Sequence, residues 1–146
     1  MNKKMEKAKK IIGWSAAILV SLLMFGSAYI KLFVVGVNPE MTAMFQRGGI
    51  YDIRHYLAAA DLIIPIIFLM PRTMTLGFVL AVGYWGGAAA TVITHGDYQE
   101  LPIHFVVLFL LGIASWFRHP EIWTRFLRGA KERNAIIDLP QSKEEK

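Results

Sequence analysis

The stretch IIGWSAAILVSLLMFGSAYI, residues 11–30, carries no charge over twenty residues. A helix of that length rises about 30 Å, which matches the hydrocarbon core of a lipid bilayer. A second stretch, residues 73–94, is also uncharged over twenty-two residues. The two stretches therefore predict two membrane-spanning helices.

Two further apolar stretches are weaker candidates for membrane spans when each is considered alone. Residues 53–70 contain Asp61, and residues 101–117 contain His104. Of the sixteen Lys and Arg residues, thirteen lie in the N-terminal tail, around Arg72 or in the C-terminal tail. Because cytoplasmic segments are enriched in Lys and Arg, this distribution favours four spans with both termini in the cytoplasm. We therefore expect an all-α integral membrane four-helix bundle.

The same pattern divides the chain. We expect a basic cytoplasmic N-terminus at 1–10, a transmembrane domain at 11–117, a basic amphipathic interfacial segment at 118–135 and a disordered tail at 136–146. Cleavage of residues 1–28 as a signal peptide is disfavoured, because the apolar run exceeds the usual 7 to 15 residues. With 55% hydrophobic residues, the chain leaves no room for a soluble domain.

Charge and cysteine content exclude several functions. The net charge of +5 sits in the tails. There it sets topology and attracts anionic membrane lipid, so we do not expect nucleic-acid binding. The chain has no cysteine, which excludes disulfides, thiolate nucleophiles and Cys-ligated clusters. Redox chemistry would need a cofactor supplied by another molecule.

A short helix is predicted between the first two spans. The sequence NPE at residues 38–40 provides a capping residue, a proline at the first helical position and an acid in the first turn. Met41, Met44 and Phe45 then form an apolar stripe, and two glycines at 48–49 end the helix. The stripe either packs on the bundle or forms a lid over an entry from the outer leaflet.

Glycines are concentrated in the third expected span. Gly83 and Gly87 form a small-xxx-small step, which lets helix backbones approach in lipid. The step predicts a close helix contact inside the bundle. A homo-oligomer seam and a slot for a flat ligand are the alternatives.

Asp61 is the residue whose placement in a membrane costs the most free energy. A carboxylate at bilayer depth costs about 2.5 to 3.5 kcal/mol unless it is paired or protonated. Lys31, near the outer end of the first span, is the expected partner, while Arg54 is displaced by about 10 Å along the helix of Asp61. Pro65 cannot donate to the carbonyl of Asp61, so we expect two acceptors facing one pocket. Asp61 is then either half of an architectural ion pair or a carboxylate that handles protons or binds a ligand.

The third span also has a polar face. Tyr84, Thr91 and His95 lie on it by helical spacing, and His104 lies one turn into the fourth span. We expect these side chains to share a ligand or proton site, or to act as hydrogen-bonding groups at the helix ends.

A metal site is the less favoured alternative here. It would use His95, Asp97, Glu100 and His104, but their spacing matches no well-defined metal motif, and we expect no metal.

The order of these features resembles the DoxX-like family of small four-helix bacterial membrane proteins. The resemblance covers about residues 14–117 and rests on GSAYIKL at 26–32, the acidic Asp61, and the Gly/Ala-rich span closing on THG at 94–96. Its name-giving members are subunits of a thiosulfate:quinone oxidoreductase. By position, Lys31, Asp61 and His95 match the recurrent polar residues, with Asp61 where many members have Glu. The resemblance implies location in the bacterial inner membrane.

Two functions follow from the residues and the resemblance together. In the first, the chain is an oxidoreductase subunit without a redox cofactor of its own, binding a quinone beside a redox enzyme partner. Asp61 and His95 then act as catalytic proton relays, and Lys31, Asp61, Tyr84, Thr91, His95 and His104 bind the ligand. In the second, it is a non-catalytic helper or lipid carrier that stabilises a partner protein.

The charge distribution predicts the topology directly. A reporter fused after Lys146 should read cytoplasmic, and one inserted between Gly48 and Gly49 should read external, because the cationic residues flank one side. Reporter activity in whole cells measures both positions. An external reading after Lys146 would contradict the four-span topology.

Overall fold

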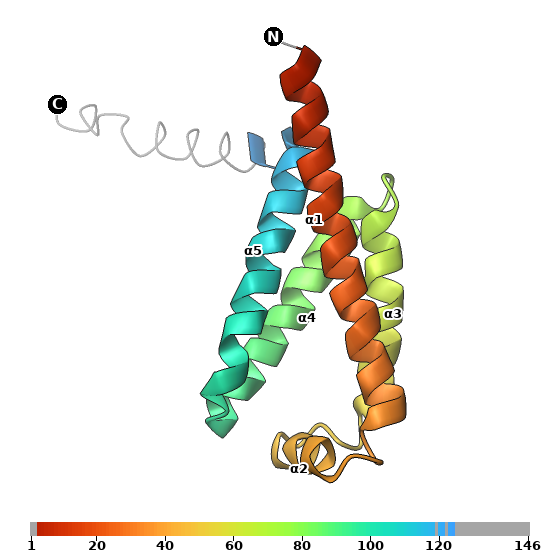
Figure 1. Cartoon of the computed structure of the whole chain (residues 1–146), viewed down its shortest axis with the longest axis vertical. Coiled ribbons are helices and arrows are strands. Elements are labelled where there is room, and N and C mark those ends of the chain that lie inside the picture. The colour runs from red at the N-terminus through yellow and green to blue at the C-terminus, as the bar shows by residue number, and fades with distance from the viewer. Residues whose placement is uncertain (1–2, 119, 122, 125–146) are drawn as a thin grey trace, which may run out of the picture.

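The computed structural model describes residues 3–118, 120–121 and 123–124 (Figure 1). Within these ranges the chain is all-helical and contains no strand. The α-helices are α1 (Lys3–Tyr29), α2 (Pro39–Arg47), α3 (Arg54–Leu69), α4 (Met74–His95) and α5 (Leu101–Arg118). A π-helical turn, η1 (Ile30–Val34), extends α1, and a 3-10 turn, η2 (Tyr98–Glu100), precedes α5.

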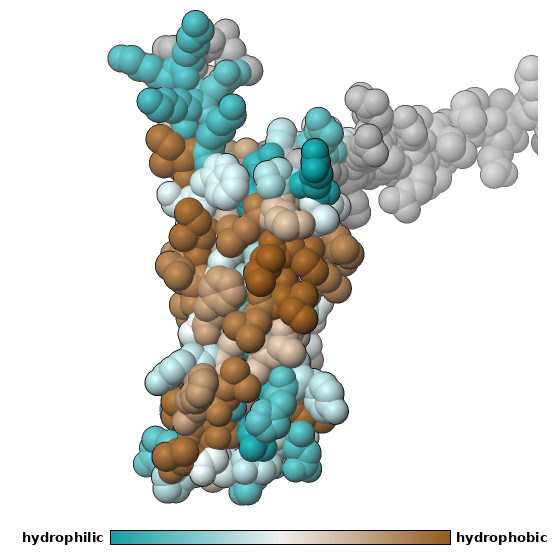
Figure 2. Space-filling view, turned by 90° about the vertical axis from the view of Figure 1, so that its right-hand side faces the viewer, coloured by the Kyte–Doolittle hydropathy of each residue, from teal (hydrophilic) through white to brown (hydrophobic). Residues whose placement is uncertain are grey.

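Three helical segments of the described chain are long and apolar enough to cross a membrane. They are Lys3–Val34, Met74–His95 and Tyr98–Arg118. An apolar belt lies between two polar ends in the space-filling view (Figure 2). These segments agree with the first, third and fourth expected spans, and they indicate a membrane protein. The second expected span corresponds to α3, which has only sixteen residues and is not among the three.

The four longer helices pack against one another in a closed order. α1 contacts α3 and α5, and α4 contacts the same two helices, so α1 and α4 lie on opposite corners (Figure 1). Small side chains such as Ala17 on α1 and Ala114 on α5 are fully buried, which lets the helices approach. The turn at residues 71–73 joins α3 to α4, and these two helices contact each other.

The closest glycine contact lies at Gly77, not at Gly83 or Gly87. A Cβ built on Gly77 would lie 2.4 Å from the backbone nitrogen of Phe68. A Cβ on Gly83 or Gly87 would meet nothing within 4 Å. The predicted helix contact inside the bundle at Gly83 and Gly87 is therefore wrong. The reason is that α3 and α4 are closest at their connecting turn and diverge beyond it (Figure 1).

The short helix α2 has the predicted ends. The side-chain oxygen of Asn38 accepts hydrogen bonds from the backbone nitrogens of Glu40, at 2.9 Å, and Met41, at 3.2 Å. Gly48 follows the last residue of the helix. α2 lies across the end of the molecule opposite to the N-terminus (Figure 1).

The structure describes more of the expected N-terminal segment than of the expected C-terminal segments. The basic segment at 1–10 is helical from Lys3 and continuous with α1. Of the expected interfacial segment 118–135, only residues 118, 120–121 and 123–124 are described, and the expected disordered tail at 136–146 lies outside the described residues.

The Gly77 contact gives a stability prediction. Gly77→Ala should lower the free energy of unfolding by about 1 to 3 kcal/mol, because the added methyl group clashes with the backbone of α3. Gly86→Ala is the matched control, since a Cβ there meets nothing within 4 Å. Thermal unfolding in detergent compares the two variants. Equal stability of both would contradict the close contact.

Candidate functional site

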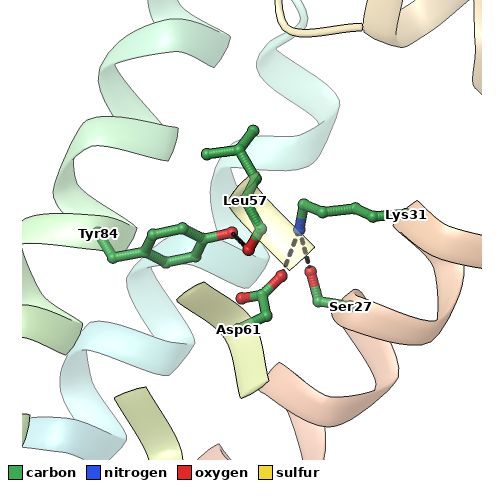
Figure 3. A network of polar contacts seen from close by, with 5 residues as sticks. All are labelled: Ser27, Lys31, Leu57, Asp61 and Tyr84. Atoms are coloured by element: carbon green, nitrogen blue, oxygen red, sulfur yellow. Dashed lines mark hydrogen bonds and ion pairs between the residues drawn. The ribbon is translucent and has the colours of Figure 1, made fainter. Parts of the chain in front are cut away.

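The site is built around an ion pair between Lys31 and Asp61. Lys31 lies on η1 and Asp61 near the middle of α3, with 2.6 Å between Nζ and Oδ2 (Figure 3). The Asp61 side chain is fully buried, and the Lys31 side chain is 11% exposed. Lys31 also donates to the hydroxyl oxygen of Ser27. The predicted pairing is confirmed.

Arg54 does not pair with Asp61. Its guanidinium donates to the carbonyl of Tyr51 at 3.1 Å and stacks over the Tyr51 ring, 4.3 Å from the centroid. This agrees with the displacement along α3 expected from the sequence.

Tyr84 adds α4 to the pair. The Lys31 Nζ lies 5.8 Å from the centroid of the Tyr84 ring. The Tyr84 hydroxyl donates to the carbonyl of Leu57 at 3.4 Å and points toward Asp61 (Figure 3). The second carboxylate oxygen of Asp61, Oδ1, is buried without a hydrogen-bond partner among the described residues. Lys31, Asp61 and Tyr84 thus join three helical elements in one polar cluster.

Beside this cluster lies a cavity of about 740 Å³. Its walls come from the end of α1 with η1, the start of α3, the second half of α4 and the start of α5, and α2 covers it. Five of the six expected ligand-binding residues line it: Lys31, Tyr84, Thr91, His95 and His104.

Asp61 is the exception among the expected ligand residues. It is fully buried and is not part of the cavity wall, whereas Lys31 and Tyr84 are. The expectation of two Asp61 acceptors facing one pocket is therefore wrong. The ion pair itself is the reason, because Lys31 lines the cavity and its ammonium group lies against the Asp61 carboxylate.

The glycines and α2 also contribute to the wall. Gly83 and Gly87 line the cavity, which supports the slot among the alternatives for this step. Met41, Met44 and Phe45 line it from α2, so the apolar stripe faces the bundle. Their positions are those of a cover over the cavity.

Trp85 is a cavity residue that the sequence did not single out. It lines the cavity, is 8% exposed, and its Nε1 is buried with no acceptor among the described residues. Its ring packs edge-on against His104, with 5.4 Å between centroids. Its position one residue after Tyr84 placed it off the predicted polar face, so periodicity alone gave no signal.

Both cavity histidines are held by their own helices. Nδ1 of His95 lies 2.8 Å from the carbonyl oxygen of Thr91, and Nδ1 of His104 lies 2.7 Å from that of Glu100. A carbonyl oxygen only accepts, so Nδ1 carries the hydrogen in each ring. In the neutral imidazole, Nε2 is then the nitrogen that can accept a hydrogen bond.

A second hollow of about 780 Å³ lies between α2 and the α4–α5 connection. It shares Met41, Met44, Asp97 and Glu100 with the cavity beside the ion pair. The second hollow therefore adjoins the cavity at these residues.

The alternative of a metal site is not supported. Among the residues that the structure describes, no group of three or more His, Asp or Glu side chains is arranged to hold a metal ion. His95, Asp97, Glu100 and His104 are spread over the rim and wall of the cavity instead.

Comparison of the chain with protein-family models, curated proteins and solved structures gives no match. The function is therefore argued from the geometry of the site.

The ion pair predicts a coupling between two substitutions. Lys31→Ala and Asp61→Ala should each lower the free energy of unfolding by about 3 to 5 kcal/mol, because each leaves an uncompensated buried charge. The double variant should recover much of that loss. Thermal or chemical unfolding of the four proteins in detergent measures the coupling. Strictly additive losses would contradict a direct pair.

Proposed function

We propose that this chain is a small membrane subunit of a quinone-linked redox system, similar to the DoxX-like proteins. In this proposal it binds a quinone-like lipophilic molecule in the cavity beside Lys31. The observation that carries the proposal is the cavity itself, in which polar groups of four elements converge on an otherwise apolar space. Its volume falls in the range of small-molecule sites, about 300 to 1,000 Å³.

The proposal includes a four-helix membrane bundle with both termini in the cytoplasm of a bacterial cell. The N-terminus, the α3–α4 turn and the end of α5 lie at the same end of the molecule, which supports this topology (Figure 1). Although α3 is short, Arg118 donates to the carbonyls of Phe68 and Leu69, at 3.2 and 2.9 Å. These bonds satisfy two backbone carbonyls at the C-terminal end of α3 and tie α3 to α5. In the proposal, α3 is therefore the fourth helix of the bundle.

The chemistry of the wall suits a ring that carries oxygen atoms. Lys31 and Tyr84 supply a cation and a hydroxyl at the inner side, and the histidines supply acceptor nitrogens. His95 is the proton relay nearest the second hollow, because it lines the cavity next to Asp97, which both hollows share. Asp61 acts through Lys31, since it does not reach the cavity. Electrons pass to or from a redox partner subunit, because the chain carries no cysteine to hold a cluster.

The alternative is a non-catalytic helper or lipid carrier. One observation favours it. Asp61 forms an ion pair with Lys31 that ties η1 to α3, and its buried side chain does not contact the cavity. Under this alternative the cavity holds a membrane lipid, and the ion pair is purely architectural.

Filling the cavity distinguishes a ligand site from an empty space. Gly87→Leu should remove co-purifying quinone, because the new side chain extends into the cavity that Gly87 lines. Stability should be retained, since a Cβ at this position meets nothing within 4 Å. Gly86→Leu is the matched control: it also has open space around its Cβ but does not line the cavity.

The measurement is mass spectrometry of lipids extracted from the detergent-purified proteins. Quinone in wild type and Gly86→Leu, with at least a tenfold loss in Gly87→Leu, supports the quinone site. Phospholipid in place of quinone, lost in the same variant, supports the carrier alternative. Equal quinone content in all three proteins would contradict a quinone site in this cavity.

A further inference from the structure

Ser27 carries a hydroxyl hydrogen that no described residue accepts. Hydroxyl groups inside helices commonly donate to the carbonyl one turn earlier, as those of Ser21, Thr91 and Thr94 do here, at 2.8 to 3.0 Å. Ser27 makes no such bond with any acceptor among the described residues, and its oxygen accepts from Nζ of Lys31. A hydroxyl group can accept at its oxygen and still donate its hydrogen. The hydrogen of Ser27 is therefore available to another molecule.

The side of α1 that carries Ser27 faces the cavity beside the ion pair. Ser27 lines this cavity and is partly exposed, unlike Asp61, which is fully buried. Gly26 also lines the cavity, and a Cβ there would meet nothing within 4 Å, so open space adjoins Ser27. The ammonium group of Lys31 carries hydrogens and no acceptor, so the hydroxyl hydrogen turns away from it. An oxygen of a molecule in the cavity can then accept this hydrogen.

The contact with Lys31 also makes Ser27 a stronger donor. Hydrogen bonds in a chain polarise one another, and a bond from a cation does so most strongly. The positive charge itself is balanced by Asp61, at 2.6 Å from Nζ (Figure 3). The acceptor that suits Ser27 is therefore an uncharged oxygen.

We propose that Ser27 is a specificity-determining residue of the cavity, whose hydroxyl group donates a hydrogen bond to a carbonyl oxygen on the ring of the ligand. This inference rests on the proposed function and deepens it, because it assigns the donor that recognises a quinone. A carbonyl oxygen has two lone pairs and no hydrogen, so it complements a donor of this kind. Gly83 and Gly87 line the same cavity without side chains, which leaves space for a flat ring.

The ester carbonyl of a membrane lipid has the same acceptor chemistry without the flat ring. The test therefore uses three probes with apolar chains: decylbenzoquinone, decylbenzene and methyl laurate. Their affinities are measured with detergent-purified wild-type protein and with Ser27→Ala. The variant should bind decylbenzoquinone about three- to tenfold more weakly, which corresponds to the loss of one hydrogen bond. Its affinity for decylbenzene should be unchanged, because that probe has no acceptor.

Ser15→Ala is the matched control. Ser15 is a serine of the same helix that is exposed and does not line the cavity, so the variant should bind all three probes as wild-type protein does. Thermal unfolding checks that each variant is folded.

An infrared measurement separates direct donation from an indirect effect through Lys31. A carbonyl group that accepts a hydrogen bond stretches at a lower frequency than a free one. One carbonyl band of decylbenzoquinone bound to wild-type protein should therefore lie below its position in an apolar solvent, and it should move up in Ser27→Ala. Ser27→Cys keeps the shape of the side chain but is a weak donor, so it should move the band in the same direction.

The outcomes separate this inference from the proposed function. Equal affinity of wild-type protein and folded Ser27→Ala for decylbenzoquinone overturns the role of Ser27, while the cavity remains a site for a lipophilic ring. An unshifted carbonyl band in wild-type protein does the same, even if neither variant folds. Dependence on Ser27 for methyl laurate alone assigns the carbonyl to a lipid and overturns recognition of the ring. Failure of wild-type protein to bind any probe overturns the inference and the proposed function together.

Discussion

The arrangement of this protein depends on the ion pair between Lys31 and Asp61. An isolated charge buried among these apolar helices would cost several kcal/mol, so neither side chain is stable there without the other. The pair must therefore form, and it joins the end of α1 to the middle of α3. The π-helical turn at Ile30–Val34 begins just before Lys31. Such turns insert an extra residue and are frequent at functional sites.

The cavity follows from where the helices can and cannot approach. Gly77 lets α4 meet the backbone of Phe68 close to the α3–α4 turn. From that contact the two helices diverge (Figure 1). Farther along α4, the glycines at 83 and 87 supply no side chains to fill the widening gap. Glycine therefore has opposite effects at two positions along α4. At Gly77 it allows contact, and at Gly83 and Gly87 it leaves space.

The sequence was enough to predict the ion pair and the polar helix face. It was not enough to predict where two helices diverge from each other. The Lys31–Asp61 pair could be found because an unpaired carboxylate in an apolar helix is so costly that its partner must be near. The face of Tyr84, Thr91 and His95 could be found because helical spacing is regular. The burial of Asp61 behind Lys31 could not, since it depends on how separate helices pack together, which the spacing along one helix does not give. Trp85 was missed because its unpaired Nε1 is visible only once its neighbours are placed.

The electrostatic balance of the cavity decides which ligands it suits. Lys31 is the cationic residue in its wall, and Asp61 lies 2.6 Å from the ammonium group behind it. At that distance in a medium of low dielectric constant the two charges largely cancel for any molecule farther away. The acids of the wall, Asp97 and Glu100, lie where the cavity adjoins the second hollow. An anion in the cavity would therefore be repelled by these two carboxylates and would gain little from the neutralised Lys31. An uncharged molecule meets neither penalty, and it gains from the apolar surface of α2 and α4. This balance supports the proposal of a neutral, lipid-soluble ligand over a charged solute of similar size.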